Sequence, residues 1–505
     1  MRSACTQDAG NNHERWNVME KNNNPQLKKQ LNPANVWAIA FGCIIGWGSF
    51  VNPGKKFLPN SGVAGTTIAM ILGALVMIVI AFSYAYMVPK YPKAGGEYTF
   101  TKECFGGNLA TCCGWFLIAA YLTNVPMNST AIGLIVDGLD GSADILKFGF
   151  HYTIAGFEVY LGEILLASAI LILFGLLNLW GVKKAAFVQT VLSVLLVGSV
   201  AVLSVAALFS SKVQWENVAP LWGFDKTAAM QAGATTANIG EFANTGTRGI
   251  LSAILATFAI APWAYVGFDT IPQAAEEFKF SYRKVIFIMV LAIVFGCFVY
   301  TANNFVAAAA LQNWPERVMA GEWVLLIAAE EILGVFGKVL IGVAVSSAVL
   351  SGIMGFYLAS SRLLYSMAND GRMPKLFGKV EAKYGTPKNA ILFCIIISLS
   401  GPILGREALG WFLDMSAIGA SMGYFFTCAS TLKKMKQNGD KIMPIKILAI
   451  VGVIFSVIFM ILQLIPIPGL DGVHFGKESY ILLLVWIVIG LIFGLLSKRK
   501  SSRIP

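Results

Sequence analysis

Charged residues are scarce in this chain. Only 13% of its 505 residues are Asp, Glu, Lys or Arg, against roughly 25% in an average soluble protein. Hydrophobic residues make up 56%, and the mean hydropathy is +0.68. This composition excludes a soluble enzyme domain as the bulk of the chain, and it favours a protein that crosses a membrane many times.

Histidine is nearly absent as well. The three copies, His13, His151 and His474, fall in the predicted N-terminal tail or in outer loops. A zinc site or a Cys–His pair therefore cannot be assembled inside the membrane. The eight cysteines fall in predicted helices or on the inner side, so the sequence implies no disulfide framework. We expect no metal, no cofactor and no enzymatic activity.

A secretory signal peptide is also missing, because residues 1–30 are polar and contain no apolar h-region. We expect this tail to be disordered. Long apolar runs follow it, and a spanning helix needs about 20 such residues. They predict an all-α integral membrane protein with about twelve transmembrane helices, in the segments 34–57, 63–88, 106–136, 161–181, 185–210, 250–275, 285–311, 335–368, 389–404, 407–432, 445–465 and 479–497.

The net charge of +11 is unevenly distributed. If the N-terminus is cytoplasmic, the inner segments hold 28 of the 38 Lys and Arg residues. This asymmetry follows the positive-inside rule. It predicts a multi-pass protein of a cell (inner) membrane, of the bacterial type, with both termini in the cytoplasm. The basic excess then serves topology in the lipid bilayer, and we expect no nucleic-acid partner.

Two apolar segments are interrupted by glycine and proline. They read GCIIGWGSFVNPG at 42–54 and FAIAPWAYVGFD at 258–269. An unpaired backbone group inside hydrocarbon costs several kcal/mol, so a broken helix persists there only if a ligand or water satisfies it. Two breaks, one opening each half of the chain, are typical of the binding site of a secondary transporter. The alternative is a contact between glycine-packed helices.

The first break predicts an anion site beside a cation site. The amides of Trp47, Gly48 and Ser49 are expected to lack i−4 partners, and free amides at a helix N-terminus bind a carboxylate. The carbonyl groups around Ile45 end the preceding half-helix and attract a cation.

The second break adds carbonyl groups. Pro262 and Gly267 interrupt the hydrogen-bond ladder, which is expected to free the carbonyls of Trp263, Ala264 and Val266. An anion site that faces a cation site at this separation suits the zwitterion of an α-amino acid.

The first break resembles that of the amino acid–polyamine–organocation (APC) superfamily, whose first-helix pattern is G-x-x-I-G-S-G-I-F-x-x-P-G. Trp47 and Ser49 stand where the family usually has Ser and Ile. The matching residues are Gly42, Ile45, Gly46, Gly48, Phe50, Pro53 and Gly54.

Three further blocks carry the same resemblance. YPKAGGEYTFTKECFGG matches the family's P-x-x-G-G-x-Y loop, YVGFDTIPQAAEEFKFSYRK is similar to the sixth helix and its exit, and SSRLLYSMANDGRMPKLF is similar to the exit of the eighth. The matching residues are Pro92, Gly95, Gly96 and Tyr98, then Gly267, Phe268, Ala275, Glu276, Glu277 and Arg283, then Arg362, Tyr365, Met367, Ala368, Asp370, Gly371 and Pro374.

The resemblance covers about residues 35–435. It implies a five-plus-five inverted repeat with broken helices 1 and 6, and alternating access around the breaks. We accordingly expect a cytoplasmic tail at 1–33, a transport core of ten helices at 34–435, and helices 11 and 12 with a tail at 436–505. The implied activity is secondary active transport of an amino acid, by uptake or exchange.

The departures from the family bear on coupling. A Lys that the fifth helix often carries is replaced at or near Leu196, which favours exchange or uniport over proton coupling through that Lys. A sodium site would need hydroxyl groups from the eighth helix, where Ser346, Ser347 and Ser351 are available; such serines also serve as packing residues. Asp269 is a candidate for proton coupling, and the alternative is a structural hydrogen-bonding role. Asp414 is a second buried acid of the same kind.

Side chains near the breaks are candidates for selectivity and gating. Tyr121, Asn124 and Asn128 lie on one face of the third helix, where they line the pocket or join helices. Trp263 matches a gating aromatic of the family and is predicted to cover the substrate. Glu277 and Arg362, at helix exits, are predicted to form an inner gate.

Two other functions stay open from the sequence. A polyamine or amine antiporter would need acids in the pocket, and only Asp269 and Asp414 qualify. A transporter-like nutrient sensor, or a channel, would be expected to add a signalling tail or domain, and the termini show no such segment.

Overall fold

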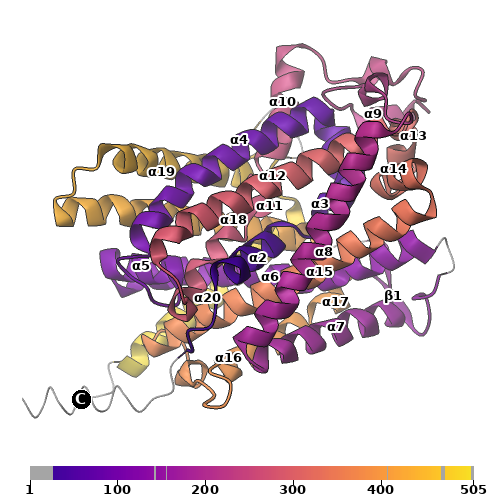
Figure 1. The fold of residues 1–505 in the computed structure, drawn as a ribbon. Helices are drawn as coiled ribbons and strands as arrows, with labels where there is room; N and C mark the ends of the chain where they lie inside the picture. The colour runs from indigo at the N-terminus through magenta and orange to yellow at the C-terminus, as the bar shows by residue number, and fades with distance from the viewer. Residues whose placement is uncertain (1–26, 141–143, 155, 407, 468–472, 502–505) are drawn as a thin grey trace, which may run out of the picture.

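The structure is a computed structural model that describes residues 27–140, 144–154, 156–406, 408–467 and 473–501. Long helices lie side by side in one bundle (Figure 1). The strands among the described residues are β1 (His151–Ile154) and β2 (Phe157–Tyr160), an antiparallel hairpin that pairs His151 with Tyr160. The prediction of an all-α membrane fold is confirmed.

The first half of the bundle ends with α8. Its elements are α2 (Pro33–Ile44), α3 (Gly48–Asn52), the π-helical η1 (Pro53–Phe57), α4 (Leu58–Met87), α5 (Gly96–Phe105), α6 (Gly107–Asp140), α7 (Leu161–Leu179) and α8 (Val182–Phe209). A long connection follows, with η2 (Trp215–Val218), α9 (Lys226–Gln231) and η3 (Ile239–Phe242).

The second half begins with an interrupted helix. Its elements are α10 (Gly246–Phe258), α11 (Ala261–Tyr265), η4 (Phe268–Thr270), η5 (Pro272–Glu277), η6 (Tyr282–Lys284), α12 (Val285–Ala309), α13 (Trp314–Met319), α14 (Val324–Leu333), α15 (Val335–Asn369), η7 (Lys375–Gly378), α16 (Lys388–Ser398), α17 (Gly401–Leu404) and α18 (Ala408–Asn438). Two further helices, α19 (Met443–Leu464) and α20 (Lys477–Ser501), complete the chain.

All twelve predicted segments fall on helices. Among the described residues, eight helical stretches are long and apolar enough to cross a membrane. The other predicted segments lie on α2, on α16 with α17, on α18 and on α20. At 389–404 the predicted single helix is divided between α16 and α17.

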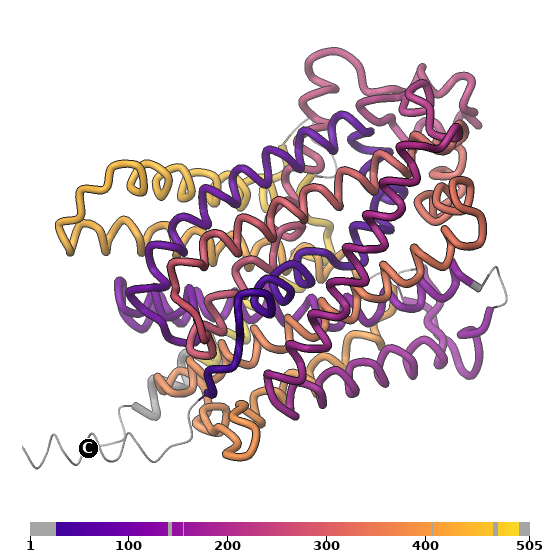
Figure 2. Tube along the Cα trace, viewed as in Figure 1, coloured from indigo at the N-terminus to yellow at the C-terminus, as the bar shows by residue number. Residues whose placement is uncertain are grey.

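Local sequence sets both ends of α2. The side chain of Asn32 accepts a hydrogen bond from the Asn35 amide, and Pro33 occupies the first helical position, so the helix begins with a complete capping box. It ends at Ile44 because Ile45 turns to an extended conformation with φ −96° and ψ 98°. Figure 2 shows α2 in the middle of the bundle, where it packs against α8, α12 and α15.

The second break touches the first directly. α11 ends at Tyr265, and Gly267 takes a φ of +142°, which side chains other than glycine rarely adopt. A Cβ atom on Gly267 would lie 2.6 Å from the Ile44 nitrogen and 2.8 Å from the Ala40 oxygen. The close approach of the two backbones therefore requires glycine at this position.

The outside of the bundle is apolar, whereas polar groups are buried within it. Phe187, Leu208 and Phe209 are 69%, 78% and 86% exposed, but Glu97, Asp269 and Arg362 are at most 1% exposed. A protein in water would bury the first set and expose the second. The arrangement suits a lipid environment, with the polar groups reserved for the interior.

Candidate functional site

A small enclosed cavity lies where the two breaks meet. Its volume is about 10 Å³, which is room for about one water molecule. It is lined by Cys43, Ile44, Gly46, Trp47, Asn124, Met127, Asn128, Trp263, Val266 and Tyr300. A larger, open hollow of about 740 Å³ lies beside α15 and the end of α6, away from the breaks. We take the smaller cavity as the site because it contains the interrupted backbone.

The first break exposes a slightly different set of amides from the predicted one. The Ser49 amide donates to the Gly46 carbonyl at 3.3 Å, and the Ser49 hydroxyl donates to the same oxygen at 3.0 Å. The expectation of a free Ser49 amide is therefore wrong, because the chain closes a tight turn there. Among the described residues, the amides of Gly46, Trp47 and Gly48 and the carbonyl of Ile45 have no hydrogen-bond partner.

The second break also differs from expectation at one group. The Val266 amide donates to the Trp263 carbonyl at 3.2 Å, so the prediction that this carbonyl is free is wrong. The carbonyls of Ala264 and Val266 accept no hydrogen bond from the described part of the chain. These two oxygens, with that of Ile45, keep the predicted capacity to attract a cation.

Tyr121, Asn124 and Asn128 all lie on α6, the third membrane helix, but only two of them reach the cavity. Asn124 and Asn128 line the cavity, and Asn124 also donates to the Ser416 hydroxyl at 2.6 Å. Tyr121 does not line the cavity. Its hydroxyl group lies 3.1 Å from Asp269 Oδ2 and 3.2 Å from Glu97 Oε1, so packing places this tyrosine in a buried polar cluster instead.

Two indole rings cover the cavity. The ring centroids of Trp47 and Trp263 are 6.4 Å apart and tilted by 55°. Trp263 lies directly over the first break, because a Cβ atom on Gly48 would come within 2.3 Å of its Cη2 atom. In this conformation the side chain of Trp263 fills the space beside the free Gly48 amide.

Two buried polar atoms at the cavity have no partner. Trp47 Nε1 and Asn128 Oδ1 are unsatisfied among the described residues. An unpaired buried donor or acceptor typically costs about 1–3 kcal/mol. The cavity therefore offers one unused donor and one unused acceptor to a ligand, in addition to its backbone groups.

Cys43, Ile44, Met127 and Tyr300 line the cavity although sequence reasoning did not select them. They belong to helices whose apolar sequence looks the same on every face. Only the i, i+3 and i+4 spacing from residues at the breaks could have singled out Cys43 and Ile44.

A second polar cluster lies beside the sixth-helix break. Glu97 accepts hydrogen bonds from Tyr84 at 2.7 Å and from Gln273 at 2.6 Å, while Asp269 accepts from the Gly267 amide at 2.7 Å. Tyr121 lies between the two acids. Sequence reasoning missed Glu97, because it lies in the glycine-containing loop motif between two apolar segments, and only its acidic side chain at that place was available as a signal.

The two acids lack a positive partner. None of the ion pairs found among the described residues includes Glu97 or Asp269. Burial, followed by the charge of Asp269, raises the pKa of Glu97 to about 8. Two carboxylates that both contact the hydroxyl group of Tyr121 would repel each other if both were ionised.

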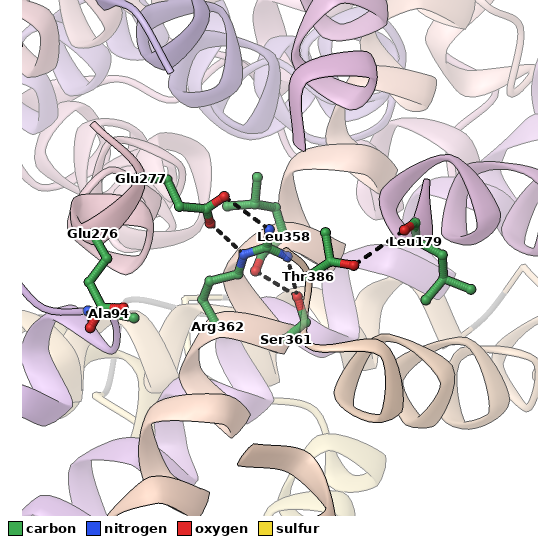
Figure 3. A network of polar contacts seen from close by, with 8 residues as sticks. All are labelled: Ala94, Leu179, Glu276, Glu277, Leu358, Ser361, Arg362 and Thr386. Atoms are coloured by element: carbon green, nitrogen blue, oxygen red, sulfur yellow. Dashed lines mark hydrogen bonds and ion pairs between the residues drawn. The ribbon is translucent and has the colours of Figure 1, made fainter. Parts of the chain in front are cut away.

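The predicted gate residues are in direct contact (Figure 3). Arg362 on α15 donates from Nε to Glu277 Oε1 at 2.8 Å and from Nη2 to Oε2 at 3.3 Å. The two side chains are 1% and 0% exposed. The pair is thus fully buried and bidentate, a geometry that is stronger than a surface pair.

The segment before α2 fastens this end of the bundle further. The amides of Gln30 and Leu31 both donate to the Glu277 carbonyl at 2.9 Å, and Lys279 donates back to the Leu31 carbonyl at 2.9 Å. Leu31 and Phe278 form a parallel bridge. The sixth membrane helix (α10 to η5) and the eighth (α15) are therefore held together at this end by backbone pairing as well as by charge.

The residues considered for ion coupling lie at separate places in the bundle and do not form one site. Leu196 is fully buried and leaves its position on α8 without a charge. Ser351 donates to the Gly42 carbonyl at 3.2 Å, whereas Ser346 and Ser347 line the larger hollow. Asp414 accepts a hydrogen bond from Ser479 on α20 at 2.6 Å, which is a contact between helices.

The sequence profile described as amino acid permease matches residues 31–493. The chain belongs to the amino acid permease family. Its relatives include the branched-chain amino acid permease BcaP of Bacillus subtilis, which is 24% identical over 95% of each chain. This family consists of transporters, and the resemblance to the APC superfamily is thereby confirmed.

Two mammalian relatives match a smaller share of their own length. The large neutral amino acids transporter small subunit 2 of Oryctolagus cuniculus is 27% identical over 74% of this chain and 64% of the relative. Human Asc-type amino acid transporter 1 is 25% identical over 73% of this chain and 64% of the relative. The match thus spans less than two thirds of the length of these transporters.

Proposed function

We propose that this protein transports an amino acid across a cell membrane by alternating access, in uptake or exchange. The observation that carries the proposal is the pairing of two helix breaks around one cavity. Free amides at Gly46, Trp47 and Gly48 provide an anion site, and free carbonyls at Ile45 and Ala264 provide a cation site. An α-carboxylate and an α-ammonium group would satisfy both at once.

The substrate that fits best is a neutral amino acid. The residues lining the cavity include no acidic or basic side chain, so a charged substrate side chain would remain unpaired there at high cost. The relatives named for branched-chain and large neutral amino acids agree with this choice. Trp47 Nε1 and Asn128 Oδ1 would contact polar groups of the bound substrate.

A polyamine or amine antiporter is less well supported. Such a substrate lacks a carboxylate and would require acids in the cavity wall. Asp269 does not line the cavity, because its carboxylate is turned to the Gly267 amide and to Tyr121. Asp414 contacts Ser479 on α20.

Two contacts support a closed conformation of the pathway. Trp263 covers the break, and the Glu277–Arg362 pair closes the end that the charge distribution predicts to be cytoplasmic. We infer that transport requires these two contacts to open alternately. In this scheme Trp263 acts as a lid over the substrate, and the Glu277–Arg362 ion pair acts as the inner gate.

Uptake and counterflow in proteoliposomes test the proposal. The full chain should accumulate labelled neutral amino acids from a panel, and acidic, basic and polyamine substrates should compete poorly. Accumulation of a polyamine in preference to neutral amino acids would overturn the proposed substrate class.

Gly48 provides a test of the carboxylate site. A Cβ atom at Gly48 would meet Trp263, whereas a Cβ atom at Gly198 on α8 would meet no atom within 4 Å. Gly48→Ala and Gly48→Val should therefore abolish uptake without preventing membrane insertion, and Gly198→Ala should leave uptake near the original level. Normal uptake by a well-folded Gly48→Val protein would rule out the site.

A further inference from the structure

The polar cluster beside the sixth-helix break contains two acids, Glu97 and Asp269, that are both within hydrogen-bond distance of one tyrosine hydroxyl group. The single hydroxyl proton of Tyr121 faces both Asp269 Oδ2 at 3.1 Å and Glu97 Oε1 at 3.2 Å. A tyrosine hydroxyl can donate only one hydrogen bond. If it donates to Asp269, the contact with Glu97 is attractive only when Glu97 carries a proton and donates it to the tyrosine oxygen.

The surroundings supply no positive charge to keep both acids ionised. Glu97 and Asp269 are fully buried, and a buried charge without a partner is neutralised by a shift of its pKa. The other titratable groups that face the pair are Tyr84 on α4, Tyr121 and Cys113 on α6, Tyr424 on α18 and Cys43 on α2. Tyrosine and cysteine are ordinarily neutral at pH 7, so they cannot balance two negative charges.

The two acids belong to different elements of the bundle. Glu97 lies on α5, which is anchored to the end of α15 by the Lys102–Asp370 ion pair at 2.5 Å and by a hydrogen bond from Tyr98 to Asp370 at 3.0 Å. Asp269 lies on η4 of the broken helix, two residues after Gly267. Gln273 on η5 also donates to Glu97.

We propose that Glu97 and Asp269 form a proton-binding site, in which the two carboxyl groups share one proton through Tyr121, and that this proton holds the broken sixth helix against α5 and α6. With the proton bound, the hydrogen-bond chain from Asp269 through Tyr121 to Glu97 is complete. Without it, two carboxylates face each other across the interface and repel. Loss of the proton therefore favours opening of the end that Glu277 and Arg362 close.

The site differs from a coupling site driven by a gradient. The proton enters from solution, binds one carboxylate oxygen and returns to solution, without a change of covalent bonds elsewhere. Its occupancy depends on the pH at the site. That the site controls exchange rests on the amino acid transport proposed above; the existence of the shared proton does not.

Infrared spectroscopy of the full chain in lipid nanodiscs tests the shared proton directly. The original protein should show a protonated carboxyl band at neutral pH that disappears as the pH rises past about 8, because burial raises the pKa of Glu97 to about 8. Glu97→Gln should remove this band, because Asp269 alone accepts from Gly267 and Tyr121 and ionises. Glu103→Gln changes an exposed acid of the same helix and should leave the band intact.

Labelling of Cys43, which lines the cavity, tests the conformational effect. For a site that titrates near pH 8, the protonated fraction falls about tenfold between pH 7 and pH 9, and the deprotonated fraction rises by the same factor. Labelling by a small maleimide, relative to the exposed Cys112, should rise by up to that factor in the original protein and in Glu103→Gln. In Glu97→Gln the ratio should stay flat, because a neutral amide cannot lose a proton.

Two results would overturn the proposal. The first is a carboxyl band that is absent at neutral pH or unchanged in Glu97→Gln. The second is a Cys43 labelling ratio that follows pH equally in Glu97→Gln and in the original protein. Neither measurement requires amino acid transport, so failure of this proposal is distinguishable from failure of the proposed function.

Discussion

At the scale of single residues, two tryptophan side chains limit the size of the cavity at the first break. Trp47 stands where the family usually has a serine, and Trp263 lies over Gly48. The two rings are in contact range, with centroids 6.4 Å apart. Each can bury roughly 150–250 Å² of surface. Together they reduce the space available to a substrate side chain while leaving the backbone groups of the break in place.

Replacing Trp47 with Ser should enlarge the cavity. The amides of Gly46 and Gly48 do not depend on the side chain at 47, so backbone recognition should persist. The expected result is a change in substrate ranking, with bulkier amino acids admitted, more than a uniform loss of uptake. Competition by a size-graded series of amino acids against a bound reference substrate measures this. An unchanged ranking would mean that the indole of Trp47 only packs between helices.

Replacing Trp263 with Ala should act on rate. The ring covers Gly48, and a site that cannot be occluded does not commit its substrate to translocation. We expect a lower maximal exchange rate, with a smaller effect on the binding of the reference substrate. Initial rates of counterflow over a range of substrate concentrations separate the two effects. A mutant with an unchanged maximal rate would argue against the lid.

At the scale of elements, the sixth helix is held at its exit by charge and by backbone pairing. The Arg362 side chain binds both oxygens of Glu277, and the segment before α2 binds the Glu277 carbonyl. Removing one partner of a buried ion pair typically costs about 3–5 kcal/mol, because the other charge remains buried and unpaired. The closed conformation is therefore sensitive to changes at these two side chains.

Arg362→Gln should weaken closure of this end strongly, because Glu277 would remain charged without its partner. Glu277→Gln combined with Arg362→Gln should recover part of the loss, since no unpaired charge is left. Thermal unfolding in nanodiscs and labelling of Cys43 report the two effects. Lys388→Gln breaks an exposed pair with Glu381 at 3.5 Å and should change neither by more than the roughly 1 kcal/mol expected of surface pairs. A double mutant no better than Arg362→Gln would contradict this account.

At the scale of the whole molecule, ion coupling has no positive charge to rely on at position 196 of α8, the fifth membrane helix. Leu196 is fully buried there, and the carbonyls of the breaks accept a cation only as part of the substrate or as a separate ion. An exchanger needs no more than a site that opens alternately to each side. The shared proton of Glu97 and Asp269 would then set how readily one side opens.

Counterflow in proteoliposomes at equal pH on both sides should proceed without a proton gradient. Internal substrate should accelerate uptake, because return of the loaded carrier replaces return of the empty one. Flux measured with and without internal substrate, and with and without an imposed gradient, tests this. A strict requirement for an inward proton gradient, with no counterflow, would contradict this prediction and make Asp269 the first candidate for the coupling residue.

The sequence alone determined where the chain leaves regular helix. Glycine and proline act on their own backbone, so the breaks near Gly46 and Gly267 and the twelve helical segments could be predicted without knowledge of packing. Composition likewise fixed the membrane class, because apolar length is a property of a segment.

Only the tertiary structure decided which groups meet at those breaks. The Ser49 amide and the Trp263 carbonyl are taken up by local turns that propensity does not specify. Tyr121 turns from the cavity to the acids, and Glu97 reaches Gln273, 176 residues away in the chain. Such partners are selected by the packing of α5, α6 and the broken helix against one another, and contacts between segments so far apart leave no periodic signal in a single sequence.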